Sequence, residues 1–273
     1  MGLTTSRCYI ASRSQIRPQK KMQREQHRGK SRHGVRSLAL PPPFRLVLLR
    51  EVGDAFVHAC VHAAALGAGT LVFVGRFDLA EFAVVLEPDE PLATARCAFY
   101  ACMVALGDAL AAPAPPEKPI VIQWPDAVYI DGGLIGGGRL AWPAHADECA
   151  APDWLVFGAA IRTAFPHREE PGLHPRSTAL AEESFADVSS ERLAEGFARH
   201  LMVAVDRWQE KGFAPIAKDY ISRLEPRSGV SSNIGENGDL VIRRDGEVIE
   251  HRYLLPALKV PSWLDPRTGG PRL

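Results

Sequence analysis

The chain has 273 residues, of which 46% are hydrophobic and 23% are charged, and its formal net charge is zero. This length fits one large domain or a large and a small one, and the composition is that of an ordinary folded, soluble protein. No apolar run approaches the ~18–20 residues of a membrane span, and no hydrophobic stretch follows the basic N-terminus as a secretory signal requires. We therefore expect a cytoplasmic protein.

Residues 1–40 concentrate positive charge, with ten Lys/Arg against one acid, Glu25. This segment has no apolar periodicity and cannot offset its ordering entropy, so residues 1–43 are predicted to be a disordered basic tail. Three interpretations stay open: a start assigned too far upstream, with Met22 or a later position as the true beginning, a targeting peptide, or a tail for polyanions. The remainder is mildly acidic, so a nucleic acid is expected to bind only the tail.

Apolar periodicity and turn residues predict alternating helices and strands after Pro41-Pro42-Pro43. In chain order these are a strand at 44–49, a helix from a cap at Asp54 to Gly67 and Gly69, strands at 70–74 and 82–86, a long core helix from Pro91 to Pro113, strands at 119–124, 128–130, 134–142 and 154–161, a long helix over 193–208, and a hairpin at 239–255. Residues 165–190 form a polar connection of the kind that is often functional or mobile. The predicted fold class is α+β, a mixed β-sheet flanked by helices over residues 44–225 with a small C-terminal β domain at 226–273.

One hairpin carries a recognisable motif. Trp124-Pro125-Asp126 leads into a strand, a tight turn at residues 131–133 and a strand that contains Gly136-Gly137. This stretch resembles the central motif of biotin protein ligases, in which Lys-Trp-Pro-Asn-Asp enters a hairpin with Asn-Gly at its turn and glycine shortly after. Residues 154–161, 197–224 and 235–240 are similar to the family's later strand, its closing helix and bend, and its small SH3-like C-terminal domain.

The resemblance covers residues 44–258 and is closest to a divergent branch of biotin/lipoate A/B protein ligase-like proteins with a Trp-Pro-Asp motif. It implies the biotin/lipoate protein ligase-like fold. It also implies chemistry in which a carboxylate attacks the α-phosphate of ATP, after which a carrier-domain lysine attacks the acyl-adenylate. Charge develops on phosphate and acyl oxygens, so a fixed cation there is worth several kcal/mol.

The cationic side chains that this chemistry uses are absent or reduced in number. The position of the family's lysine before Trp-Pro holds Gln123, and the second lysine position holds Leu134. The family's loop of alternating Gly and Arg is matched only by residues 67–69 and by Gly75-Arg76. An ordinary ligase is therefore not expected.

The candidate site residues follow from the resemblance, and each has an open structural alternative. The catalytic candidates are Gln123 and Asp126, and the ligand-binding candidates are Gly69, Gly75, Arg76, Trp124, Pro125, Gly136, Gly137 and Gly158. The alternatives are a capping role for Asp126, a core position for Trp124, a solvated charge for Arg76 and close packing for the glycines. The expected ligands are ATP with biotin, lipoate or octanoate. No metal site is recognised, because His58 and His62 lack further ligands.

Three functions compete. The first is a biotin-, lipoyl- or octanoyl-protein ligase or transferase, in which Cys149 is a candidate nucleophile without an evident base; Cys97 and Cys102 are expected to be buried thiols. The second is a non-catalytic binder of a small acyl ligand or of a biotinyl/lipoyl carrier domain. The third is an interaction protein that merely inherited its fold. A cation beside Gln123, such as Arg76 or Arg139, favours the enzyme, and a dry apolar pocket favours the binder.

Overall fold

The computed structural model describes residues 38–51, 53–165, 174–185 and 188–273. The predicted basic tail lies outside the described residues as far as residue 37. The prediction is wrong for the residues that follow, because the side chain of Leu38 is buried in the core and the N–H of Ala39 donates to the carboxylate of Glu195 at 2.7 Å. The predicted connection at 165–190 is described only in part, and its placed residues form turns.

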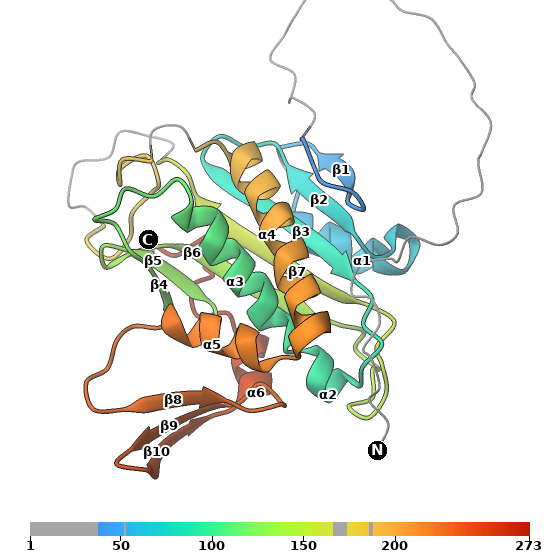
Figure 1. Ribbon diagram of the computed structural model, residues 1–273. Helices are drawn as coiled ribbons and strands as arrows, with labels where there is room; N and C mark the ends of the chain where they lie inside the picture. Colours follow the sequence, from blue (N-terminus) through green and yellow to red (C-terminus); the bar gives the residue numbers. More distant parts are fainter. Residues whose placement is uncertain (1–37, 52, 166–173, 186–187) are drawn as a thin grey trace, which may run out of the picture.

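A seven-stranded sheet with the order β1-β2-β3-β7-β6-β5-β4 forms the centre of the molecule (Figure 1). Its strands are β1 Arg45–Leu49, β2 Thr70–Val74, β3 Leu79–Leu86, β4 Ile120–Gln123, β5 Ala127–Ile130, β6 Gly133–Ala141 and β7 Leu155–Arg162. The β1–β2 pair is parallel and the other pairs are antiparallel. The predicted mixed sheet flanked by helices is therefore confirmed.

Helices cover the two faces of this sheet unequally. The helices are α1 Ala55–Leu66, α2 Leu92–Ala95, α3 Ala98–Ala111, α4 Ser190–Lys211, α5 Ala214–Ser222 and α6 Leu254–Lys259. α3 and α4 lie across one face (Figure 1), where Phe157 of β7 stacks on Phe197 at 5.6 Å between ring centroids. On the opposite face, the alanines of α1 pack on valines of β2 and β3. Both faces of the central strands are buried, which explains their continuous apolar sequence.

The two ends of α1 match the sequence signals. Asp54 is the N-cap, and its carboxylate accepts the N–H of Val57 at 2.9 Å. The helix ends at Gly67, whose positive φ of 71° suits glycine. The predicted cap and stop are confirmed.

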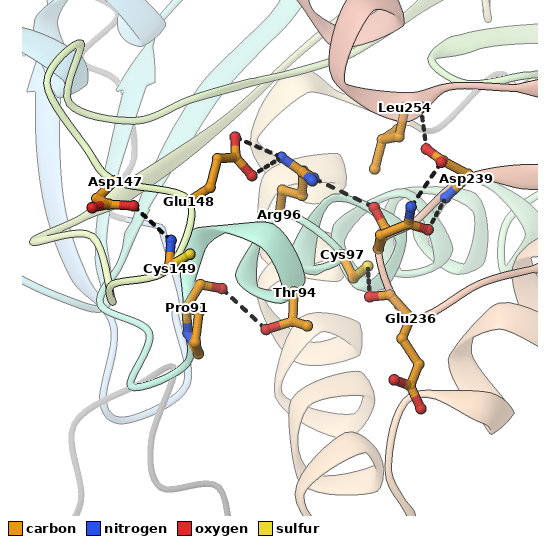
Figure 2. Close-up of polar contacts among 11 residues, drawn as sticks. Pro91, Thr94, Arg96, Cys97, Asp147, Glu148, Cys149, Glu236, Asp239 and Leu254 are labelled. Atoms are coloured by element: carbon orange, nitrogen blue, oxygen red, sulfur yellow. Dashed lines mark hydrogen bonds and ion pairs between the residues drawn. The ribbon is translucent and has the colours of Figure 1, made fainter.

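The single long helix predicted from Pro91 is wrong in detail, because α2 and α3 are separated at Arg96 and Cys97. Arg96 binds the carboxylate of Glu148 there, as Figure 2 shows. It also donates to the carbonyl oxygen of Asn237. The segment Leu92–Ala111 is also long and apolar enough to cross a membrane, contrary to the sequence prediction. It is 83% buried within the fold, as expected of a core helix.

A second, three-stranded sheet with the order β10-β9-β8 follows α5. Its strands are β8 Ser231–Ile234, β9 Leu240–Arg244 and β10 Glu247–Arg252. Strands β9 and β10 form the predicted hairpin, and this sheet is the small C-terminal β unit that resembles the SH3-like domain of the family. After α6, however, residues 261–272 leave this unit and return to the large sheet, which the sequence did not predict. We call residues 261–272 the C-terminal strap.

Candidate functional site

The N-terminal end of α1 gathers charged side chains from three elements. Glu81 on β3 is buried and accepts the N–H of Ala55 at 2.8 Å. Arg139 on β6 places Nη2 at 3.1 Å from Oδ1 of Asp54 and its guanidinium carbon at 4.1 Å from the ring centroid of Phe56. Desolvation by burial raises the pKa of Glu81. Arg139 is therefore held in place by an ion pair and a cation–π contact.

A pocket of about 310 Å³ opens beside Arg139, between α1, β6 and the C-terminal part of the chain. Its wall residues are mainly apolar: Phe56, Leu140, Ala141, Trp142, Leu258, Pro261 and Leu264, with Arg139 and Lys259 as the charged members. Apolar walls around a fixed guanidinium suit a small carboxylate with an apolar body. We call this cavity the α1-face pocket.

The C-terminal strap covers the sheet next to this pocket. The indole ring of Trp263 is 1% exposed and packs with Ala127, Leu134 and Ala160. Its Nε1 donates to the carbonyl oxygen of Gly138 at 3.0 Å. The ring lies directly over Gly137, where an added Cβ would collide with it. Trp263 therefore fills a hollow that the glycine leaves open.

Two charged side chains hold the two ends of the strap: Asp126 in the turn before β5, and Arg162 at the end of β7. At one end, the N–H and Oγ of Ser262 donate to Asp126 at 2.9 and 2.6 Å. At the other end, Nη2 of Arg162 donates to the carbonyl oxygens of Pro271 and Arg272 at 2.8 and 3.1 Å. Desolvation by burial raises the pKa of Asp126 to about 6, against the effect of its bonds to Ser262.

The three residues of the Trp-Pro-Asp motif connect different parts of the fold. The indole N–H of Trp124 donates to the hydroxyl of Tyr100 at 3.0 Å, and the hydroxyl of Tyr220 donates to the carbonyl oxygen of Pro125 at 2.6 Å. Asp126 holds the strap. Three consecutive residues thus bind α3, α5 and the C-terminal strap, so the motif fixes the relative positions of these parts.

Gln123 lies in a different cavity, a groove of about 260 Å³ between the edge of the large sheet and the small sheet. It accepts a hydrogen bond from the hydroxyl of Tyr129 at 3.0 Å. Trp124, Arg227 and Arg252 line the same groove. Both arginines bind the carboxylate of Glu250, at 3.0 and 2.6 Å. Cations therefore do lie near Gln123, but they come from β10 and from the connection before β8, and both already have a partner.

The predicted phosphate loop is not assembled. Gly69 and Gly75 flank opposite ends of β2, so six residue steps along an extended chain separate them by roughly 20 Å. Arg76 binds Asp78 through two hydrogen bonds, at 3.1 and 2.7 Å, and this carboxylate raises the pKa of Arg76. Within the described residues, these groups do not form the Gly/Arg run that would hold an adenylate.

The remaining predicted glycines serve close packing. A Cβ at Gly136 would collide with the carbonyl oxygen of Ala160, and one at Gly158 would press on Phe56, which lines the α1-face pocket. The candidates Gln123, Gly136 and Gly137 therefore do not line one cavity within the described residues. Gln123 lines the groove, whereas Gly137 lies buried beneath Trp263 of the strap and Gly136 lies against the backbone of β7.

Neither the cysteines nor the histidines complete a reactive or metal-binding group in the part of the chain that the structure describes. Cys149 is exposed, and its N–H donates to Asp147 at 2.8 Å (Figure 2). The predicted buried thiols are confirmed: Cys97 and Cys102 are buried. The rings of His58 and His62 lie 4.5 Å apart, but no group of three or more His, Cys, Asp or Glu there could hold a metal.

Sequence reasoning missed the strap residues and Phe56. Arg139 was considered only as a cation that could reach Gln123, which it does not do. It is the one charged side chain of β6, at a position where the strand is otherwise apolar or glycine. A lone arginine in such a strand was a usable signal of a polar site. Nothing in the sequence around Ser262 and Trp263 indicates which surface they cover.

This fold is that of the biotin protein ligases. A biotin protein ligase from Aquifex aeolicus aligns with a TM-score of 0.60 at 17% identity, over 77% of this chain and 95% of its own. A biotin protein ligase-like protein of unknown function from Silicibacter sp. TM1040 aligns with a TM-score of 0.68 at 29% identity, over 81% of this chain and 99% of its own.

Sequence comparison identifies the family. A biotin--[acetyl-CoA-carboxylase] ligase from Paracoccus denitrificans is 28% identical over 198 residues, which are 65% of this chain and 77% of the relative. The model of the biotin/lipoate A/B protein ligase family matches residues 40–222. The chain belongs to this family.

Proposed function

We propose that this chain binds a small apolar carboxylate in the α1-face pocket, as a ligase-like protein in which Gln123 replaces the catalytic lysine. The observation that carries the proposal is the position of Arg139 within an apolar cavity of about 310 Å³. Among the described residues, Asp54 engages only Nη2 of this guanidinium. Its other nitrogens can donate to a ligand carboxylate, and the apolar walls can bury the acyl body.

The separation of the two cavities supports binding over ligation. Gln123 lines the groove at the sheet edge, and Arg139 lines the α1-face pocket, and the two cavities share no lining residue. A ligand in the pocket therefore does not meet the position at which the family places its lysine. The Arg76–Asp78 pair likewise leaves the predicted phosphate-binding cation with an acid partner.

The test is the affinity of the protein for octanoate, lipoate and biotin, measured by isothermal titration calorimetry. We expect Arg139→Gln to weaken binding of the best ligand about tenfold or more, because the carboxylate loses a charge-assisted hydrogen bond. Arg76→Gln is the matched control, since Arg76 is also a partly buried arginine paired with an aspartate. Equal losses in the two variants, or no binding of any acid, would refute the proposal.

A second candidate function is transfer of an acyl group to a lysine of a carrier domain. The observation that favours it is the groove in which Gln123 lies with Arg227 and Arg252. A complex of the Aquifex aeolicus enzyme with biotin and ATP has been solved, with a TM-score of 0.55 and 17% identity to this chain. We propose to supply ATP with each acid, or an acyl thioester, together with a biotinyl or lipoyl carrier domain. Acylation of the carrier domain, detected by mass spectrometry, would establish transfer. If no acylation is seen while the acid binds measurably, the protein is a non-catalytic acid-binding protein.

A further inference from the structure

The C-terminal strap occupies the part of the large sheet that adjoins the α1-face pocket. Pro261 and Leu264 form pocket walls, and Trp263 lies between them in the chain with its ring on Gly137. If the strap moved away, the pocket would extend from Arg139 over Gly137 to Leu134 and the alanines beside it. The indole thus fills the inner half of a longer cleft.

The strap is attached at separate points and does not add a strand to the large sheet, whose seven strands are all accounted for by β1 to β7. Its hydrogen bonds to that sheet go to Asp126, to the carbonyl oxygen of Gly138 and to Arg162. The remaining bonds of its backbone lie within the strap, where Leu264 bridges Pro271. Few attachments of this kind favour local opening without unfolding of the core.

The hydrogen bonds that hold the strap at Asp126 also carry a cost, because they require the carboxylate to stay buried. This residue is 1% exposed, and its carboxylate accepts two hydrogen bonds from the strap, one from the N–H and one from the hydroxyl of Ser262. Arg272, at the far end of the strap, contributes only through space. Opening the strap would return the carboxylate to water and recover hydration that the closed form gives up.

We propose that the strap is a displaceable occupant of the acyl cleft, so that the acid and Trp263 compete for the surface over Gly137. This inference rests on the proposed function, because it concerns access to the same pocket. An apolar acyl chain that starts at Arg139 reaches the inner half only when the indole leaves. The strap therefore sets the affinity and the length of acid that the protein accepts.

The first experiment measures hydrogen–deuterium exchange of the full chain, first alone and then with octanoate. We expect the amides of Ser262 and Arg272 to exchange through local opening, faster than the amides of β7, and octanoate to speed their exchange further. Exchange of the strap at the rate of β7 would show that it opens only with the core. Slower exchange with octanoate would show that the strap closes over the ligand. Either result would overturn the proposal.

The second experiment compares binding of octanoate and biotin to wild type, Trp263→Ala and Arg267→Ala. Trp263→Ala empties the inner cleft, so we expect about tenfold tighter binding of the better probe. Arg267→Ala is the control within the strap, because its side chain is 89% exposed, and it should bind as wild type does. Ser262→Ala, which removes one bond to Asp126, should tighten binding by a smaller factor and serves if Trp263→Ala does not fold.

The outcomes separate the two proposals. Binding to wild type that depends on Arg139 but is unchanged by Trp263→Ala and Ser262→Ala would overturn the strap proposal and leave the pocket as the binding site. No binding of either probe to any variant, including those with a weakened strap, would overturn both.

Discussion

The two faces of the large sheet are built in different ways. Under α3 and α4, aromatic rings pack against one another, as in the Phe82–Phe197 pair at 4.8 Å and the Phe99–Phe157 pair at 6.0 Å. Under α1 the sheet presents mainly valines, and under the strap it presents alanine and glycine. The charged side chains of Glu81, Asp126, Arg139 and Arg162 also lie on this side of the sheet. The first face is closed by aromatic packing, and the second combines apolar packing with directed polar contacts.

The difference indicates which face can change its partner. Water cannot replace the contacts between packed aromatic rings, so the face under α3 and α4 becomes exposed only when the protein unfolds. On the face under α1 and the strap, burial raises the pKa of both Glu81 and Asp126, so holding these carboxylates in their charged form costs free energy. Buried groups with raised pKa values are concentrated at functional sites. We infer that the face under α3 and α4 contributes most to stability and that the face under α1 and the strap is the one that binds a ligand.

The largest expected effect is a difference in stability between one aromatic substitution on each face. Phe197→Ala leaves a cavity in the aromatic core and should lower the free energy of unfolding by about 3–5 kcal/mol. Trp263→Ala should cost only about 1–2 kcal/mol, because its cost cannot exceed the free energy with which the strap docks. Chemical denaturation followed by circular dichroism measures both. Equal losses would show that the strap is as integral to the fold as the helix face.

The next effect is a pH dependence that belongs to the strap face alone. The pKa of Asp126 in the folded protein is about 6, above its ordinary 3.8. The folded protein therefore holds this proton more tightly than the unfolded chain, and protonation stabilises the fold. The contribution is complete below pH ~4 and is lost as the pH rises through 6, a change of about 2 kcal/mol between pH 4.5 and 7.5.

The measurement compares wild type with Asp126→Asn, because other titrating groups cancel in the difference. The stability of wild type relative to the variant should fall from pH 4.5 to pH 7.5. A difference that stays constant, or that grows with pH, would mean that Asp126 is not desolvated under the strap. Phe197→Ala serves as a control and should show the pH dependence of wild type.

Most of the fold could be predicted because its signals are local. The alternating or continuous apolar runs of β2 and β7, the cap at Asp54 and the stop at Gly67 each lie within a few residues of the structure that they specify. The break at Arg96 could not be predicted, since its partners Glu148 and Asn237 are 52 and 141 residues away. A local helical pattern carries no record of such contacts.

The site was predicted less well because it depends on segments that meet only in the folded chain. The motif at residues 123–126 indicated the family, but residues 124–126 form the turn between β4 and β5. Their contacts are with Tyr100, Tyr220 and Ser262, which are distant in the sequence. Gly137 was identified as a place where something approaches closely, which is what glycine in a strand signals. That the approaching group is Trp263, 126 residues further along the chain, has no local signature.

The smallest effect expected is that of Arg76→Gln, which tests the residue predicted to bind a phosphate. Arg76 and Asp78 form a partly exposed pair, with 34% and 16% of their side chains accessible. The substitution should cost about 0.5 kcal/mol of stability, as exposed pairs usually do. It should leave acid binding unchanged, because Arg76 is not a lining residue of the α1-face pocket. If wild type binds ATP by calorimetry and the variant does not, Arg76 would be a nucleotide ligand in spite of its pairing with Asp78.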